Sequence, residues 1–578
     1  MGAIRRVGTT LAALASLQLC MAQLAGPAGA GSASSPSHLA ATGSGSVGGW
    51  GHAEELPGTA TSNATGLAAV SSVSCTSAGD CAAGGYVDDR LNRLQAFVAN
   101  EVKGVWGSAE EVPGSGALNA GGTAAVNSVS CRFARSCAAG GYYTDRAGGL
   151  EAFVVDDVKG AWQGAEEVPG TSALNAGGGA EVNSLSCPSI GNCSAGGFYT
   201  DAAGAVQAFL ADEVYGSWRT AEEVPGTATL NAGGSATVTS VSCTSAGDCA
   251  AVGSYEDSSG HYQAFVVTEV KGTWGIATEL PGVASLNAGG NADAYDVSCA
   301  SAGNCSAGGY YTDGAGGLQA FVDEETGGTW GTAEELPGTA TLNAGASAAV
   351  DSLACTSSGN CVAGGYYADS SSNLQAFVVD EVDGTWQEAV EVPRTAKLNA
   401  GGYAFVSSVS CSSAGNCVAG GGYWSSFLVQ QAFVVNEVNG TWHNAKEVPR
   451  SGKLNAGGNA EVDSVSCNPA GYCVGGGDYT DISFDYQAFV AGYAPTPAVT
   501  RVLPMTGPAS GGTMVTIIGR DLVAPEAVRF GPEKARIRKV VSATRIVVVS
   551  PKGSGTVDVT VTTGGGTSAQ AAADRFSY

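Results

Sequence analysis

Hydrophobic and polar residues alternate in short runs that return at a fixed interval along most of the chain. In one period, Val238–Cys243 alternates with period two, and a Ser-Ala-Gly-Asp turn separates it from a second run, Cys249–Tyr255. A third run covers Tyr262–Val270, and a Lys-Gly turn leads to a fourth, Thr273–Leu280, which ends at Pro281-Gly282. Such alternation is typical of half-buried strands. Each period therefore predicts four short antiparallel strands joined by tight turns.

The interval is 56 residues, and tryptophan marks it most clearly. Eight tryptophans keep this spacing: Trp50, Trp106, Trp162, Trp218, Trp274, Trp330, Trp386 and Trp442. An Ala/Gly/Asn-rich segment, Val283–Ala294 in the example, separates the fourth strand of one period from the first strand of the next. Its length suits a crossing from the outer edge of one sheet to the inner edge of the next. Four antiparallel strands in each of eight repeats predict a β-propeller.

The two ends of the array distinguish a closed propeller from an open β-solenoid. Trp50 and Glu54–Pro57 are typical of a fourth strand that lacks its first three, whereas the last period, through Phe489-Val490, has three strands and no tryptophan. Joining the ends completes an eighth blade, and an open array would gain nothing from this permuted break. Solenoid coils are also usually much shorter than this repeat. We therefore expect an eight-bladed β-propeller over residues 48–494.

Each period also holds one pair of cysteines, six residues apart. With only four histidines in the chain, a C-x5-C pair is a poor zinc site, and the C-x-x-C spacing of redox enzymes is absent. In a secreted protein such pairs are typical of local disulfides, which would staple each repeat without joining repeats together. The predicted bridges are Cys75–Cys81, Cys131–Cys137, Cys187–Cys193, Cys243–Cys249, Cys299–Cys305, Cys355–Cys361, Cys411–Cys417 and Cys467–Cys473.

The N-terminus has the pattern of a secretion signal. Two early arginines precede the apolar run Leu11–Leu24, and the small residues Ala28-Gly29-Ala30 follow it. Polar residues and a proline interrupt the run well short of the ~20 apolar residues that a membrane span needs. We expect a cleaved signal peptide over residues 1–30, a Ser/Gly/Ala-rich flexible leader over residues 31–47, and a mature protein released to the cell exterior.

Charge excludes some partners and marks a domain boundary. The chain carries 26 basic and 52 acidic residues, a formal net charge of −26, which disfavours binding to nucleic acid or to an anionic membrane. Residues 31–494 hold 14 basic and 47 acidic residues, whereas residues 495–578 hold ten and five. The period stops where the charge changes sign. We therefore expect a separate domain over residues 495–578, and neither a nucleic-acid partner nor a membrane span.

Short strands separated by Gly/Pro turns are expected in this last segment. The runs are Thr513–Ile518, Ala527–Phe530, Arg545–Val549 and Val557–Val561. The motifs Val502-Leu-Pro504, Gly507-Pro-Ala-Ser-Gly-Gly-Thr513, Val528-Arg-Phe-Gly531 and Gly565-Gly-Thr-Ser568, with the ending Phe576-Ser-Tyr578, resemble the IPT/TIG family. The resemblance implies an immunoglobulin-like β-sandwich of a kind found in cell-surface receptors, in extracellular enzymes as a non-catalytic module, and in some transcription factors.

The repeat has a family resemblance of its own. The motifs S-V-S-C-x5-C-x-A-G-G-Y-Y, Q-A-F-V-V and G-T-W over about residues 50–490 resemble extracellular propeller repeats of high-GC Gram-positive bacteria. This resemblance implies a fold rather than an activity. The expected architecture is thus all-β: an eight-bladed β-propeller of 56-residue four-stranded repeats, followed by an immunoglobulin-like IPT/TIG β-sandwich.

The loop between the second and third strands supplies the candidate binding residues. This loop is rich in Gly, Ala and Ser in most periods, but two neighbouring periods carry large apolar side chains instead. Exposed aromatic clusters mark protein or carbohydrate contacts, although a locally packed hydrophobic loop would have the same sequence. The candidates are Tyr423, Trp424, Phe427 and Leu428 in the seventh period and Tyr479, Phe484 and Tyr486 in the eighth.

Acidic residues on the first strands are the candidates for catalysis. They are Glu181, Asp293, Asp296, Asp351, Glu461 and Asp463. A pair of them could hydrolyse a glycosidic bond, but scattered acids at a wet channel mouth would look the same. Calcium could bind at the turns that carry Asp145, Asp201 and Asp313, but one carboxylate per turn is a poor calcium site, and a simple Asp/Gly turn accounts for them better.

Taken together, these features predict a secreted extracellular binding or adhesion protein without a catalytic activity or a cofactor. Its partner is expected to be an extracellular glycan or a cell-surface protein, and the chain is expected to be a monomer. One alternative is a polysaccharide hydrolase or lyase with carboxylates at the propeller channel. Another is a structural surface protein without a discrete ligand.

Overall fold

A computed structural model describes residues 48–523 and 525–578 of the chain. The predicted signal peptide, residues 1–30, and the predicted leader, residues 31–47, lie outside the described residues. Within those that are described, no helix has the length and apolar character needed to cross a membrane.

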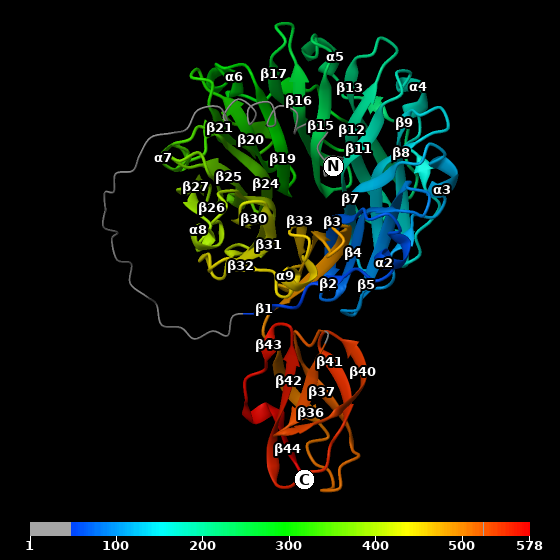
Figure 1. Ribbon diagram of the computed structural model, residues 1–578, viewed down its shortest axis with the longest axis vertical. Helices are drawn as coiled ribbons and strands as arrows, with labels where there is room; N and C mark the ends of the chain where they lie inside the picture. The colour runs from blue at the N-terminus through cyan, green and yellow to red at the C-terminus, as the bar shows by residue number, and fades with distance from the viewer. Residues whose placement is uncertain (1–47, 524) are drawn as a thin grey trace. The chain divides into compact units, whose positions relative to one another are not determined.

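Eight antiparallel sheets follow one another around a closed ring (Figure 1). Within a sheet the strands pair in sequence order, as in β15-β16-β17-β18. Each first strand contacts the first strands of both neighbouring sheets, and the last of them, β33, contacts the first, β3. The eight-bladed propeller predicted from the repeat is therefore confirmed.

The first strands are β3 (Ala68–Ser77), β7 (Ala124–Phe133), β11 (Ala180–Ser189), β15 (Ala236–Ser245), β19 (Ala292–Ser301), β24 (Ala348–Ser357), β29 (Ala404–Ser413) and β33 (Ala460–Cys467). The second strands are β4 (Asp80–Asp88), β8 (Ser136–Thr144), β12 (Asn192–Thr200), β16 (Asp248–Glu256), β20 (Asn304–Thr312), β25 (Asn360–Ala368), β30 (Asn416–Ser426) and β34 (Cys473–Thr480). The third strands are β5 (Leu94–Val102), β9 (Leu150–Val158), β13 (Val206–Val214), β17 (Tyr262–Glu269), β21 (Leu318–Thr326), β26 (Leu374–Val382), β31 (Val429–Asn436) and β35 (Tyr486–Ala494).

The fourth strand is short, and a helix of one turn follows it in every blade. The fourth strands are β6 (Glu110–Glu111), β10 (Glu166–Glu167), β14 (Glu222–Glu223), β18 (Thr278–Glu279), β23 (Glu334–Glu335), β28 (Val390–Glu391), β32 (Lys446–Glu447) and β2 (Glu54–Glu55), with the two-residue pieces β1 (Gly49–Trp50), β22 (Thr329–Trp330) and β27 (Thr385–Trp386) ahead of three of them. The helices are α2 (Thr59–Ser62), α3 (Ser115–Leu118), α4 (Thr171–Leu174), α5 (Thr227–Leu230), α6 (Val283–Leu286), α7 (Thr339–Leu342), α8 (Thr395–Leu398) and α9 (Ser451–Leu454).

This part of the repeat differs from the sequence-based expectation of one continuous fourth strand and an irregular crossing. In the fourth blade, Trp274 forms a single bridge with Glu269, and pairing resumes only at Thr278–Glu279. Gly282, with a φ of 89° that favours glycine, then starts α6. After the helix, the amide of Asn287 donates to the backbone carbonyl of Tyr262 at 3.2 Å and so ties the crossing to the third strand. The conformation of Gly282 and the contact of Asn287 stabilise a helical turn that the alternation of residues does not reveal.

Residues from the two ends of the array complete the last blade. Trp50 pairs with Tyr493 and Glu55 pairs with Phe489, so that β1 and β2 are the outer strands of the sheet built from β33, β34 and β35. The indole Nε1 of Trp50 also donates to Oδ1 of Asn436 in the neighbouring blade at 2.9 Å. The permuted closure expected from the sequence is confirmed.

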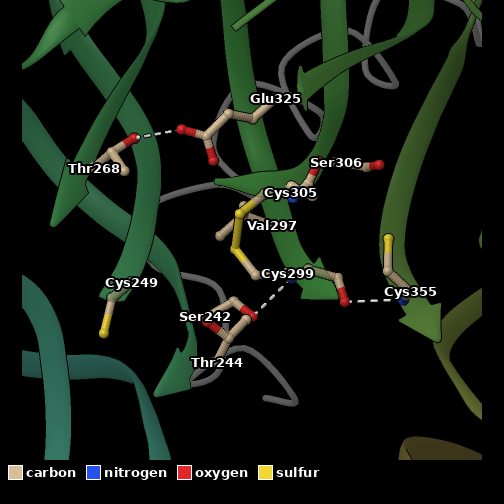
Figure 2. The surroundings of a disulfide bond; sticks show 12 residues. Ser242, Thr244, Cys249, Thr268, Val297, Cys299, Cys305, Ser306, Glu325 and Cys355 are labelled. Atoms are coloured by element: carbon tan, nitrogen blue, oxygen red, sulfur yellow. Dashed lines mark hydrogen bonds between the residues drawn. A yellow bond between two sulfur atoms is a disulfide. The ribbon is translucent and has the colours of Figure 1, made fainter. Parts of the chain in front are cut away.

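The repeated Ser-x-Ser-Cys motif joins each blade to the next. Oγ of Ser242 accepts a hydrogen bond from the backbone N–H of Cys299 in the following blade at 3.0 Å (Figure 2). The same contact closes the ring, because Oγ of Ser466 accepts from the N–H of Cys75 at 2.9 Å. All eight predicted disulfides are formed, each within one blade, with Cα–Cα distances of 3.9–4.1 Å. So many disulfides indicate an oxidising environment.

One blade lacks the serine of this motif, and a substitution there should stabilise the protein. Ala354 occupies the position at which Ser298, one repeat earlier, accepts from the N–H of Cys355 at 2.9 Å. We expect Ala354→Ser to raise the free energy of unfolding by about 1 kcal/mol, because the new hydroxyl can accept from the N–H of Cys411. Ser298→Ala should lower it by about 1–3 kcal/mol. Chemical denaturation of both variants measures the two effects, and equal signs would contradict the proposed contact.

Residues from Ala498 onward form the predicted β-sandwich. One sheet has the order β36-β37-β41-β40 and the other β39-β38-β42-β43, with β44 also paired to β42. Val502, Ile517, Phe530, Val561 and Phe576 from both sheets share one core and are almost completely buried. The elements are β36 (Ala498–Leu503), β37 (Met514–Arg520), β38 (Ala527–Phe530), β39 (Glu533–Lys534), β40 (Arg536–Ser542), β41 (Arg545–Val549), β42 (Thr556–Thr563), β43 (Gly566–Thr567), the 3-10 helix η2 (Ala572–Asp574) and β44 (Arg575–Ser577).

Candidate functional site

The predicted binding and catalytic candidates lie at one end of the ring, which we call the crossing face. It carries the helices α2–α9, the turns between second and third strands, and the N-terminal ends of the first strands. Backbone hydrogen bonds hold these parts together, for example from Gly401 N to Trp424 O at 2.8 Å and from Gly457 N to Thr480 O at 2.9 Å. The disulfides lie at the other end of the ring, which we call the disulfide end. There, the C-terminal end of each first strand meets the start of the second strand, as the pairing of Cys467 with Cys473 shows.

Two of the seven aromatic and apolar candidates belong to the core of the repeat. Tyr423 and Tyr479 are only 3% and 4% exposed. The hydroxyl of Tyr479 donates to Oε2 of Glu55 on the fourth strand at 3.2 Å, and Tyr199 makes the same contact with Glu223 at 3.1 Å in another blade. Burial, followed by the charge of Glu447, raises the pKa of Tyr423 to about 12. The two tyrosines therefore pack the blades and present no surface to a ligand.

The other candidates of the seventh blade form an aromatic platform, which we define as Tyr403, Trp424 and Phe427. The ring of Trp424 lies 5.1 Å from that of Tyr403 at an angle of 33°, and Phe427 meets Trp424 edge-on at 6.2 Å. Phe427 is 77% exposed, and Leu428 beside it is 67% exposed. Apolar side chains at this level of exposure are available to a ligand.

Tyr403 is not among the residues predicted from the sequence. The glycine that replaces an aromatic residue on the second strand of this blade could have indicated the different packing around it. The second strand has an aromatic residue at the matching position in most blades, such as Tyr366, but Gly422 takes its place in the seventh. A Cβ on Gly422 would lie 3.0 Å from the ring of Phe405, which fills the space of the absent aromatic side chain. Phe405 in turn packs against Tyr403, with ring centroids 5.5 Å apart.

The eighth blade adds exposed apolar side chains next to the platform. Phe484 is 72% exposed and Ile482, which the sequence analysis did not single out, is 83% exposed. Tyr486 is half-buried, and its hydroxyl accepts from the amide of Asn459 at 2.7 Å. Leu428 and Phe484 occupy equivalent turn positions with a φ of 65°, where four other blades have glycine. A bulky side chain at such a φ costs on the order of 1 kcal/mol of conformational free energy, so both turns are less stable than they would be with glycine.

Three carboxyl groups gather beside the platform on the channel side. Oxygen atoms of Glu461, Asp463 and Asp478 all lie within 4.8 Å of one another. Nε2 of Gln430 donates to Oε2 of Glu461 at 2.8 Å, and Oε1 of Gln430 accepts from Nε1 of Trp424 at 3.3 Å. Such a cluster could hold a divalent cation or exchange protons with a substrate. Gln430, absent from the sequence-based candidates, connects the acids to the platform.

The remaining acidic candidates are distributed around the ring. Asp296 replaces a serine of the Ser-x-Ser-Cys motif, since it accepts from the N–H of Leu353 at 2.8 Å and from the hydroxyl of Ser240 at 2.7 Å. Burial raises the pKa of Asp293 to about 7 and that of Glu181 to about 7. Asp293 and Asp351 lie near the tyrosine pair Tyr295 and Tyr310, whose ring centroids are 5.4 Å apart. Of the six acids, the structure brings Glu461 and Asp463 into one cluster, together with Asp478.

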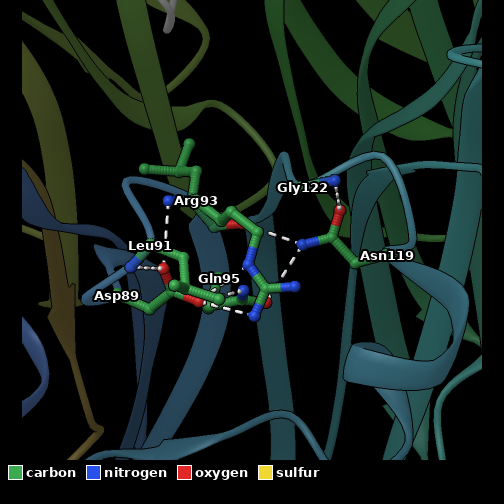
Figure 3. A network of polar contacts seen from close by, with 7 residues as sticks. Asp89, Leu91, Arg93, Gln95, Asn119 and Gly122 are labelled. Carbon is green, nitrogen blue, oxygen red and sulfur yellow. Dashed lines mark hydrogen bonds and ion pairs between the residues drawn. The ribbon is translucent and has the colours of Figure 1, made fainter.

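The candidate calcium turns are closed by hydrogen bonds of their own. Oδ1 of Asp313 accepts from the N–H of Ala315 and of Gly317 at 2.8 and 2.9 Å, and Oδ2 accepts from Gln319 at 2.8 Å. Asp145 and Asp201 accept backbone N–H groups in the same way. The turn at Asp89 adds an ion pair with Arg93 at 2.8 Å (Figure 3). These aspartates act as turn residues, which accounts for their repetition without an ion.

Comparisons with known proteins identify the C-terminal domain and place the propeller among distant neighbours. Residues 497–578 match the IPT/TIG domain. No curated protein is similar to the chain in sequence. Among solved structures, a protein of unknown function from Dyadobacter fermentans is 12% identical, covers 77% of this chain and 99% of its own, and has a TM-score of 0.35. The Hadza microbial sialidase Hz136 is 10% identical, covers 68% of each chain, and has a TM-score of 0.32.

Proposed function

We propose that this protein is a secreted, non-catalytic binding or adhesion protein that captures an extracellular glycan on the crossing face of its seventh and eighth blades. The pattern of the first 30 residues supports secretion, and the eight disulfides agree with an oxidising compartment. A glycan fits this surface better than a protein because aromatic rings and hydrogen-bonding side chains lie next to each other, within the size of a few sugar rings.

The observation that carries the proposal is the hydrogen bond of Trp424 in the aromatic platform to Gln430, which in turn donates to Glu461. A sugar ring has an apolar C–H face, which packs on an aromatic ring, and a rim of hydroxyls, which need hydrogen-bond partners. Trp424 and Phe427 offer the first, and the amide and carboxylate of Gln430 and Glu461 offer the second. A small number of placed polar groups beside aromatic side chains is typical of ligand sites.

Capture of polysaccharides should depend on the platform. We expect the double variant Trp424→Ala, Phe427→Ala of the mature chain, residues 31–578, to lose at least about tenfold in affinity for the captured polysaccharide, because two stacking surfaces are removed. A pull-down with a panel of cell-wall and extracellular polysaccharides measures this loss. Phe133→Ala is the matched control, since Phe133 is 54% exposed at the disulfide end of the ring. Equal capture by the double variant and the control would contradict the proposal.

The acid cluster favours a second candidate function, a polysaccharide hydrolase or lyase acting at the channel. Glu461, Asp463 and Asp478 provide the paired carboxyl groups that such chemistry requires. The same incubation distinguishes the two functions when released reducing ends are recorded with the capture. Release that is lost in Glu461→Gln or Asp463→Asn would support the enzyme, and capture without release supports the binding protein.

A further inference from the structure

We propose that the glycan is an anionic polysaccharide, and that its charged groups are held by two basic pairs on successive blades: Arg394 with Lys397, and Arg450 with Lys453. This inference rests on the proposed function, because it assigns a ligand class to the same face. It also explains how a strongly acidic propeller can bind an anion.

The charge of the propeller reverses locally in the segment that contains these pairs. Residues 31–494 hold 14 basic and 47 acidic residues, but residues 394–453 hold five basic residues and two acidic ones, Glu437 and Glu447. Glu437 is only 3% exposed, and burial raises its pKa to about 8. The segment is therefore positive at neutral pH. Net charge alone disfavours an anionic partner, whereas this local field attracts one.

The two pairs occupy the same place in consecutive repeats. The sequences Pro-Arg-Thr-Ala-Lys and Pro-Arg-Ser-Gly-Lys start one period apart, and each puts the arginine immediately before a helix and the lysine at its third residue. The other six crossing helices have glycine before the helix and no basic residue in it. All four basic side chains are exposed. In residues 48–523 and 525–578, the ion pairs within 4 Å involve Arg93 and Arg575 instead.

Both arginines occupy a backbone position that glycine suits better. Arg394 and Arg450 have φ values of 77° and 69°, in the left-handed region, where the six glycines of the other blades have φ values of 84–95°. A side chain at this position costs conformational free energy that glycine does not. Neither arginine makes an ion pair with another residue that the structure describes, and both side chains are exposed, so packing and ion pairing there do not account for them.

The pairs flank the aromatic platform. Helix α8 contacts β30, whose end carries Trp424, and the loop after α8 is bonded to Trp424 by the N–H of Gly401. On the other side, α9 contacts β31 and β34, and the loop after α9 accepts the N–H of Gln430 through the carbonyl of Gly458 at 2.8 Å. A polymer lying across the seventh blade would meet cations, then aromatic rings, then cations. Regularly spaced carboxylates, sulfates or phosphates on a sugar chain match this order.

The chemistry of the four side chains agrees with such a ligand. The guanidinium of arginine binds the oxygens of a carboxylate, sulfate or phosphate in a two-pronged contact, and lysine contributes a mobile positive charge. The carboxylates of Glu461 and Asp463 lie on the N-terminal part of the first strand β33, and that of Asp478 lies beside them near the C-terminal end of the second strand β34. They would repel the charged groups of the polymer and so direct those groups to the outer part of the face, over α8 and α9, while its uncharged hydroxyls can still bind Glu461.

The test measures capture of the full mature chain by three immobilised polymers, polygalacturonate, dextran sulfate and neutral dextran, and by anionic phospholipid vesicles. We expect capture by at least one of the two anionic polymers, no capture by neutral dextran, and binding that weakens at least tenfold between low and high salt. Arg394→Gly with Arg450→Gly should weaken it at least tenfold while preserving the fold, because the other blades have glycine at this position. The matched control is Lys159→Gly with Lys271→Gly, which removes two positive charges from left-handed positions at the disulfide end.

The outcomes separate this inference from the proposed function. Capture of neutral dextran that depends on Trp424 but not on Arg394 and Arg450 would overturn the anionic ligand and leave glycan binding intact. Equal losses in the arginine variant and its control would overturn the assignment of the site. Capture of anionic phospholipid vesicles in place of every polymer would overturn both proposals. Preference for polygalacturonate or for dextran sulfate identifies the carboxylate or the sulfate as the recognised group.

Discussion

Leu56→Ala should lower the free energy of unfolding by about 2–5 kcal/mol, the range for emptying a fully buried leucine site. Leu56 is completely buried and packs in the core between the last and first blades, with Val70 and Val490. Its backbone N–H donates to the carbonyl of Ala488 at 3.0 Å. Leu56 follows β2, and no disulfide within the described residues joins β2 to the other strands of the last blade. The loss of its anchor should therefore open the ring at the closure.

Denaturant unfolding and limited proteolysis of the same variants test this expectation. Leu91→Ala is the surface control, because Leu91 is 70% exposed, and it should change stability by less than about 0.5 kcal/mol. Leu280→Ala removes an equally buried leucine from the fourth blade, away from the closure. We expect cleavage near the N-terminal strand to accelerate more in Leu56→Ala than in Leu280→Ala. Equal cleavage in both would show that the ring opens elsewhere.

The second large effect is a loss of stability as the pH rises from about 5 to about 8. A carboxyl group lies within one residue of the end of the third strand in seven blades, at 3–4% exposure: Glu101, Asp157, Glu213, Glu269, Glu325, Glu381 and Glu437. Burial raises the pKa of all seven, to about 8 for Glu381 and Glu437 and to about 7 for Glu101, Glu213 and Glu269. Neighbouring carboxylates add to the shift, Glu324 at Glu381 and Asp380 at Glu437.

The sign follows from proton linkage. Between the unfolded pKa of about 4.5 and the folded values, the folded protein holds more protons than the unfolded chain, so its stability falls as the pH rises. The buried carboxyl groups contribute their full stabilisation of the fold below pH 4.5, and this stabilisation is lost as the pH rises through 7–8. Turn aspartates such as Asp201 and Asp313 have lowered pKa values, because hydrogen bonds to their carboxylates favour the charged form. Their protonation destabilises the fold, but only at more acidic pH. Stability should therefore be greatest near pH 5.

Thermal unfolding at pH 5 and pH 8 measures the effect, with Tm expected to be lower at pH 8 by about 3 °C or more. Glu381→Gln with Glu437→Gln should reduce this difference, because an amide imitates the protonated acid at both pH values. The variant should consequently unfold at a higher temperature than the parent at pH 8. Glu388→Gln, at an exposed position, should leave the difference unchanged. A Tm that rises between pH 5 and pH 8 would contradict the assignment of raised pKa values.

Much of the fold follows from patterns within one period of the sequence. The alternation of Val238–Cys243 and its neighbours determines the strands, because a residue's side of a strand depends only on its place in the alternation. The C-x5-C spacing determines the disulfides, since the two cysteines flank one tight turn. The closure could be predicted as well, because a fourth strand at Trp50 and a missing one after Val490 are visible as a difference between the two ends.

The candidate site could be predicted only in part, because its contacts cross between turns and blades. The same apolar pattern gives a buried Tyr423, which lies within β30 and packs on Phe433, and an exposed Phe427, which lies in the turn beyond the end of β30. Tyr403 meets Trp424 within the seventh blade, 21 residues later in the sequence, and Gln430 meets Glu461 of the eighth blade, 31 residues later.

The number of blades, the strands within them, the disulfides and the C-terminal domain follow from the amino-acid sequence, because each depends on short-range alternation, spacing or motif. Which side chains share a surface and which lose contact with water depends on the packing of the folded chain. The raised pKa of Glu381 requires the neighbouring blade to cover it and to bring Glu324 beside it. The placement of α8 and α9 on either side of Trp424 likewise arises when blades pack around the ring, a constraint that no single repeat contains.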